Sequence, residues 1–208
     1  MILDLLFTDP AIFLIYLGAI IVPIALHEFA HALSATMQGD PTPKAMGRLT
    51  FNPLAHIDPM GILLLLIAGF GWGKPTPFNP INLKNPRLGT VWVALAGPLS
   101  NLIQIIVFGI FLKFVAFLGP SNYLVIFLAA LLQINIILML FNLIPIPPLD
   151  GSKVLFGFLP PSTLEFQARF ERIGPLVLLG IIIVDQFTGI GVFHWIFSGI
   201  TNAIFSFF

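Results

Sequence analysis

The chain has 208 residues, of which 58% are hydrophobic and 9% charged, and its formal net charge is zero. Soluble domains carry about 25% charged residues, so a water-soluble globular protein is excluded and a membrane protein with one domain over residues 1–208 is expected. The neutral charge gives no indication of nucleic-acid binding. The chain has no cysteine, which excludes disulfides, thiolate metal ligands and cysteine nucleophiles.

Long apolar runs separated by polar, turn-rich stretches predict an all-α, polytopic bundle of membrane-spanning helices. The run near residues 60–72 is too short to cross a bilayer and predicts a re-entrant or hairpin segment. The last apolar stretch, 192–208, is expected to be an interfacial helix or a partial span. The four predicted spans are, in chain order, residues 11–37, 89–117, 122–144 and 173–188.

The basic residues predict how the bundle sits in the membrane. Lysine and arginine gather between the first two spans and again between the last two. Cytoplasmic loops carry this excess of positive charge, so both long loops are expected in the cytoplasm and the N-terminus outside. The expected location is a prokaryotic cell membrane, which the chain crosses several times.

The sequence His27-Glu28-Phe29-Ala30-His31 lies inside the first predicted span. Two histidines four residues apart share one face of a helix, so both rings can bind one metal ion. The glutamate between them can act on a water at that metal. Ionisable residues at membrane depth are costly and mark functional sites, so we interpret these residues as a zinc site.

A catalytic zinc site needs a third protein ligand. Asp150 follows the third span on the side where the first span ends, and His31 lies only about 9 Å below that end at 1.5 Å per residue. The proline-rich stretch before Asp150 cannot continue a helix but can return into a protein cavity. Asp150-Gly151 alone is typical of a turn. Because the chain also contains the histidine pair, we predict that Asp150 is the third metal ligand. The other aspartates considered are Asp40, Asp58 and Asp185.

Two further residues have weaker functional indications. His56 lies in the first long loop; a structural role in the loop is favoured over a role as a metal ligand or gate. Gly97-Pro98, within the second span, is interpreted as a point of close helix packing or as a kink.

Several motifs together resemble the site-2 protease family, the intramembrane zinc metalloproteases of peptidase family M50. The resemblance extends from about residue 11 to residue 190. The motifs that carry it are HEFAH at 27–31, GRLTFNPLAHIDPMG at 47–61, GWGKPTPFNP at 71–80, GPLSN at 97–101 and NLIPIPPLDG at 142–151.

The resemblance implies that His27, His31 and Asp150 hold Zn²⁺ and that Glu28 is the catalytic acid/base. It also implies that Asn142 and Asn101 lie near the metal and help to hold the substrate or the transition state. Many family members carry a PDZ or a CBS domain, and no insertion in this chain is long enough for either. A minimal form of the catalytic core is therefore expected.

The expected function is zinc-dependent cleavage of a substrate protein within or near its transmembrane helix, as in regulated intramembrane proteolysis. The expected partners are that substrate and the lipid bilayer, without nucleic acid, and the sequence leaves the oligomeric state open. One alternative is a membrane metal transporter, and another is a non-proteolytic relative that binds membrane helices. The ligand set favours zinc, with cobalt and iron as alternatives.

Overall fold

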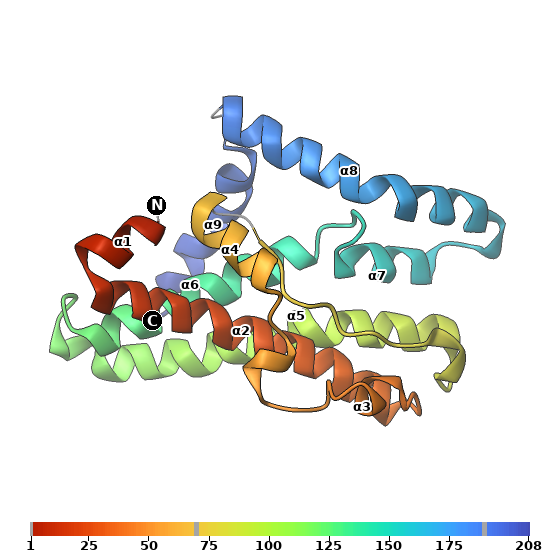
Figure 1. Ribbon diagram of the computed structural model, residues 1–208, viewed down its shortest axis with the longest axis horizontal. Helices are drawn as coiled ribbons and strands as arrows, with labels where there is room; N and C mark the ends of the chain where they lie inside the picture. Colours follow the sequence, from red (N-terminus) through yellow and green to blue (C-terminus); the bar gives the residue numbers. More distant parts are fainter. Residues whose placement is uncertain (1, 69–70, 189–190) are drawn as a thin grey trace.

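The computed structural model describes residues 2–68, 71–188 and 191–208, which are helical over most of their length (Figure 1). These described ranges contain no β-strand; an isolated antiparallel bridge joins Ile57 and Gly73. The expected all-α fold is therefore confirmed.

Three helices in the described ranges are long and apolar enough to cross a membrane, and they correspond to the first three expected spans. In Figure 1 they lie side by side and form the body of the bundle. Their bounds are Pro10–Met37 for α2, Pro86–Val115 for α5 and Tyr123–Asn142 for α6.

Polar caps fix where these three helices begin. The side chains of Asp9, Asn85 and Asn122 accept hydrogen bonds from backbone N–H groups in the first turns of α2, α5 and α6. Pro10 and Pro86 stand at the starts of α2 and α5, where no backbone donor is needed. Each cap satisfies N–H groups that would otherwise lack a partner.

The main core lies where α2, α5 and α6 meet. It is built from small and branched side chains, so the helices approach closely and leave little space. Polar side chains are also buried among them, and these lead to the site described below. The buried members of this core are Ala19, Ile105, Leu112, Leu128, Ala130, Leu131, Leu132 and Ile136.

Six further α-helices lie in the described ranges. Short α4 corresponds to the apolar segment expected near 60–72, although residues 69–70 lie outside the described part of the chain. The stretch expected to be interfacial or a partial span contains α9, which packs against α6. Their bounds are Ile2–Thr8 for α1, Thr42–Ala45 for α3, Pro59–Ala68 for α4, Asp150–Phe158 for α7, Leu164–Thr188 for α8 and Val192–Phe205 for α9.

The C-terminal part of α8 covers the fourth expected span, 173–188. The helix already begins at Leu164, within the second long loop that was expected between the third and fourth spans. Arg169 pairs with Glu165 one turn away at 2.8 Å, and this spacing supports a helix. The first turns of α8 are charged and its C-terminal part is apolar. This helix is not among the three in the described ranges that are long and apolar enough to cross a membrane.

Asp40 anchors the loop between α2 and α5. Its carboxylate is wholly buried and accepts hydrogen bonds from the backbone N–H and hydroxyl of Thr42, from Asn79 N–H and from the Asn82 amide, at 2.6–3.1 Å. Burial alone would raise the pKa of Asp40, but these hydrogen bonds outweigh it and hold the pKa below its ordinary value of 3.8. Asp40 therefore joins the end of α2 to the segment that leads into α5, and it is not part of a metal site.

We expect Asp40→Asn to lower the free energy of unfolding by about 1–3 kcal/mol, because the amide cannot accept all four hydrogen bonds. The folded pKa of Asp40 is depressed, so its contribution is full above pH 3.8 and is lost as the pH falls through the folded pKa. Denaturant unfolding in detergent should therefore show a lower free energy of unfolding for Asp40→Asn than for the unmodified protein at pH 7. The difference in this free energy should be smaller at acidic pH. Asp9→Asn is the matched control, since asparagine caps a helix equally well; an equal effect of both variants would contradict this account.

Candidate metal centre

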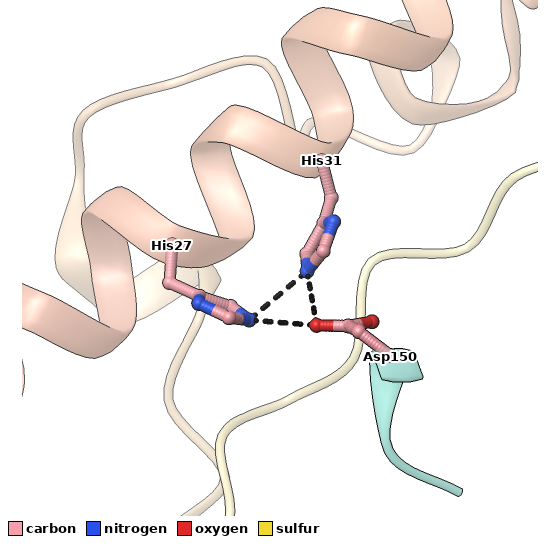
Figure 2. A group of neighbouring side chains, drawn as sticks. All are labelled: His27, His31 and Asp150. Carbon is pink, nitrogen blue, oxygen red and sulfur yellow. Dashed lines mark hydrogen bonds and ion pairs between the residues drawn. The ribbon is translucent and has the colours of Figure 1, made fainter. Parts of the chain in front are cut away.

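His27 and His31 project from one face of α2 toward Asp150, the first residue of α7 (Figure 2). The two histidine Nε2 atoms are 3.0 Å apart, and each lies 3.2 Å from Oδ2 of Asp150. The three residues are 4–7% exposed. The structure thus brings together three ligand atoms, as the sequence predicted for a metal site.

The proline-rich segment between α6 and α7 delivers Asp150 to the histidines. Prolines at 145, 147 and 148 prevent α6 from continuing, and short backbone hydrogen bonds, including Leu149 N–H to Ile146 O at 3.0 Å, turn the chain instead. A Cβ at Gly151 would collide with the backbone of Leu143. Glycine at this position therefore lets α7 start against the end of α6.

The far side of each imidazole is held by an acceptor. Nδ1 of His31 lies 2.7 Å from the backbone oxygen of Val93, and Nδ1 of His27 lies 2.6 Å from Oδ1 of Asn101. A carbonyl oxygen cannot donate, so each Nδ1 carries the proton and each Nε2 presents a lone pair to the centre. The Asn101 amide in turn donates to Asn135 Oδ1 at 2.9 Å, which fixes the orientation of Asn101.

The donor set fits zinc. Four-coordinate zinc with bonds of about 2.1 Å places neighbouring ligand atoms about 3.4 Å apart, and the three atoms here are separated by 3.0–3.2 Å. Two imidazole Nε2 atoms and one carboxylate oxygen face a common centre, and zinc binding requires both Nε2 atoms to be unprotonated. Nitrogen and oxygen donors of this kind are typical of catalytic zinc sites.

Gly97 of α5 makes room for the centre. A Cβ built on Gly97 would lie 2.5 Å from Nε2 of His31 and 2.5 Å from Cε1 of His27. Any larger side chain would therefore displace the ligand atoms. This explains the glycine of the GPLSN motif as a point of close approach between α5 and the histidine rings.

Glu28 is held by the segment that follows α4. The backbone N–H of Thr76 donates to Oε2 of Glu28 at 2.7 Å, and the Thr76 hydroxyl donates to the Glu28 backbone oxygen at 2.9 Å. Sequence reasoning did not identify Thr76, because its role depends on a contact across 48 positions of the chain.

His27, Glu28, His31 and Asp150 line one cavity of about 280 Å³. Most of its wall is apolar, and Lys153 stands at its edge, 3.6 Å from Oδ1 of Asp150. The other lining residues include Ile24, Trp72, Thr76, Phe78, Val93, Ala94, Leu138, Phe141, Asn142, Leu149 and Leu178.

The structure separates the two asparagines that the family resemblance placed together. Asn142 lines the cavity and donates one amide hydrogen to Leu138 O at 3.0 Å. Asn101 is wholly buried behind His27 and is not among the described residues that line the cavity, so it contacts His27 rather than the cavity. Asn135, which sequence reasoning missed, continues this polar chain; an asparagine within an apolar span was the available signal.

His56 lies in the loop rather than in the ligand group. It is wholly buried, and its Nε2 is 2.9 Å from the backbone oxygen of Thr50. This position agrees with the structural role favoured from the sequence.

Comparison with known proteins gives one family. The model described as "Peptidase family M50" matches residues 119–184. "Putative zinc metalloprotease YwhC" of Bacillus subtilis is 42% identical over 167 residues, which cover 77% of this chain and 76% of that protein. "Putative zinc metalloprotease Rip2" of Mycolicibacterium smegmatis is 27% identical over 216 residues, covering 94% and 78% of the two chains. Its namesake in Mycobacterium tuberculosis is 29% identical over 205 residues, covering 93% and 77%. No solved structure matches the chain.

We expect Gly97→Ala to weaken zinc binding by about tenfold or more, because the added methyl group pushes the ligand atoms apart and altered ligand orientation typically costs 10–100-fold in affinity. Zinc affinity of the purified protein would be measured by competition with a chelator. Gly180→Ala is the matched control: it lies in α8 and its Cβ would meet nothing within 4 Å. Unchanged zinc affinity in Gly97→Ala would show that α5 does not confine the site.

Proposed function

We propose that this chain, which belongs to peptidase family M50 and is a zinc metalloendopeptidase, hydrolyses a peptide bond within or near the transmembrane helix of a substrate protein. The observation that carries the proposal is the position of His27, Glu28 and His31 in α2, a helix long and apolar enough to cross a membrane. His31 precedes the end of α2 by about 9 Å. A protease site at this depth reaches peptide bonds that lie in the bilayer.

In this proposal His27, His31 and Asp150 hold the zinc ion. When bound, zinc polarises the scissile carbonyl and lowers the pKa of its water to about 7. Val93 and Asn101 keep both imidazoles in the tautomer that presents Nε2. The ligands themselves therefore need no rearrangement before the reaction.

Glu28 serves as the acid/base. Thr76 N–H occupies Oε2 of Glu28, so Oε1 is the oxygen that takes a proton from the attacking water. Glu28 then delivers this proton to the nitrogen of the leaving peptide. The hydrogen bond from Thr76 N–H keeps the carboxylate directed at the cavity during both steps, and the Thr76 hydroxyl holds the backbone of Glu28.

Asn142 is proposed to bind the substrate. Its amide nitrogen carries two hydrogens, and only one is needed for the hydrogen bond to Leu138 O. The second can be donated to a peptide oxygen, including the oxygen that becomes negative during attack. Asn101, for which the same role was expected, is proposed instead to orient His27.

The substrate is expected to unwind before cleavage. Backbone groups of a membrane helix are bonded within that helix, and an α-helix with side chains is about 10 Å wide. A largely apolar cavity of about 280 Å³ accommodates an extended segment better than an intact helix. Helix-breaking residues near the cleavage point should therefore favour cleavage, as in regulated intramembrane proteolysis.

The orientation of the bundle completes the proposal. The long loops that carry the lysines and arginines are placed in the cytoplasm of a prokaryotic cell. The zinc site lies in the part of α2 that leads into the first of these loops. Cleavage would therefore occur toward the cytoplasmic side of the membrane.

We expect Glu28→Gln to lower cleavage of a single-span substrate by about 100-fold or more, the contribution typical of an acid/base, while zinc stays bound. The assay uses purified protein in liposomes, with zinc content measured in parallel. Glu171→Gln, in α8 and exposed, is the matched control and should cleave normally.

The same liposomes separate the alternative functions. Cleavage that a chelator blocks supports the protease. Metal flux without cleavage would indicate a transporter, and substrate binding without cleavage would indicate a non-proteolytic relative. Full activity of Glu28→Gln would remove Glu28 from the mechanism.

A further inference from the structure

The motif GRLTFNPLAHIDPMG at 47–61 contains no residue used in the mechanism above, yet it buries an arginine. Arg48 is 6% exposed and lies outside the membrane-length helices. No carboxylate among the described residues forms an ion pair with it. Burying a guanidinium is costly unless its N–H groups find acceptors, so the partners of Arg48 indicate what it does.

All the hydrogen bonds found for the Arg48 side chain go to backbone oxygens of two segments. Nη1 donates to Ala55 O at 2.5 Å and to Lys74 O at 3.0 Å, and Nη2 donates to Pro75 O at 3.2 Å. The planar guanidinium can hold several acceptors in a fixed geometry, which a lysine cannot do. Arg48 therefore joins the loop before α4 to residues 73–76 after it.

Further contacts press residues 73–76 against α2. Lys74 N–H donates to His56 O at 2.8 Å, and Gly73 forms the isolated bridge with Ile57. A Cβ at Gly73 would lie only 2.7 Å from Cγ2 of Ile24 in α2. The segment is thus in close contact both with α2 and with the loop around His56.

This segment ends at the residue that binds Glu28. Arg48 holds the carbonyl groups of Lys74 and Pro75, which directly precede Thr76. Thr76 then makes its two hydrogen bonds to the side chain and backbone of Glu28. The contacts form a continuous path from a buried arginine in the loop to the acid/base.

We propose that Arg48 is a positioning residue for the reaction: it fixes residues 73–76 against α2 so that Thr76 holds the carboxylate of Glu28 at the metal centre. This inference rests on the proposed function of Glu28. On this inference the motif at 47–61 helps to position the active site and does more than link α2 to α4.

Hydrogen exchange tests the structural half of the inference without any cleavage assay. Proline has no amide hydrogen, so residues 74–77 carry exchangeable amides only at Lys74 and Thr76, and both are hydrogen-bonded. We expect Arg48→Ala to accelerate exchange of these two amides about tenfold or more in metal-free and zinc-loaded protein. Arg169→Ala, which removes an exposed arginine of α8, should leave them protected. Unchanged exchange in Arg48→Ala would overturn the proposal.

Kinetics test the functional half. We expect Arg48→Ala to retain zinc and to lower kcat by about 10- to 100-fold, the range expected when a catalytic group is misplaced by about 1 Å. Gly73→Ala should displace the same segment by another route, so the double variant should lose little more than the worse single variant. The proposal would be contradicted if the kcat losses of the two single variants multiplied in the double variant. It would also be contradicted if Arg48→Ala left kcat unchanged, or if Arg48→Ala lost activity only to the extent that it lost zinc.

A second variant covers the case in which Arg48→Ala does not fold. Arg48→Lys keeps the charge but cannot hold three carbonyl groups in one plane, so it should give intermediate exchange and intermediate kcat. If Arg48→Lys showed the same amide exchange and the same kcat as the unmodified protein, this would count against the proposal. Absence of zinc-dependent cleavage by the unmodified protein would instead count against the proposed function, and the exchange measurement would still decide whether Arg48 holds the segment.

Discussion

The hydrogen bonds on the far sides of His27 and His31 are the interactions on which the site depends. An imidazole buried in an apolar bundle needs a partner for its N–H group, and the choice of partner decides which nitrogen faces the centre. Because Val93 O and Asn101 Oδ1 accept from Nδ1, both Nε2 atoms face the centre that Asp150 Oδ2 also borders. Without these acceptors, the same two histidines on α2 would not define a metal geometry.

A single face of α5 supplies this support. Val93, Gly97 and Asn101 are spaced four residues apart, so they lie above one another along the helix. The first offers a carbonyl group, the second leaves space for the rings, and the third accepts from His27. The GPLSN motif therefore has a physical explanation as the wall behind the ligands. Glu28, the proposed acid/base, is held by a separate segment, through Thr76 and the residues that Arg48 contacts.

The sequence predicted the parts of the site that depend on local spacing. His27 and His31 follow from the helical repeat, and Asp150 follows from the proline-rich end of α6. The contacts of Thr76 and Arg48 could not be predicted, since they arise from loops that meet only after folding. The early start of α8 was not predicted, although the spacing of Glu165 and Arg169 allows a helical ion pair. Asn101 was expected near the metal, but its position behind His27 required the packing of α5 against α2.

The central claim is that two imidazoles and one carboxylate hold a single zinc ion inside the bundle. X-ray absorption at the zinc edge tests it directly on purified protein. The account predicts two histidine nitrogens at about 2.0–2.1 Å from the zinc ion and oxygen at about 2.0–2.2 Å from it. The histidine signal should be reduced in His31→Ala, and one oxygen ligand should change in Asp150→Ala. A zinc spectrum that stays the same in both variants would contradict the account, because the metal would then be bound elsewhere.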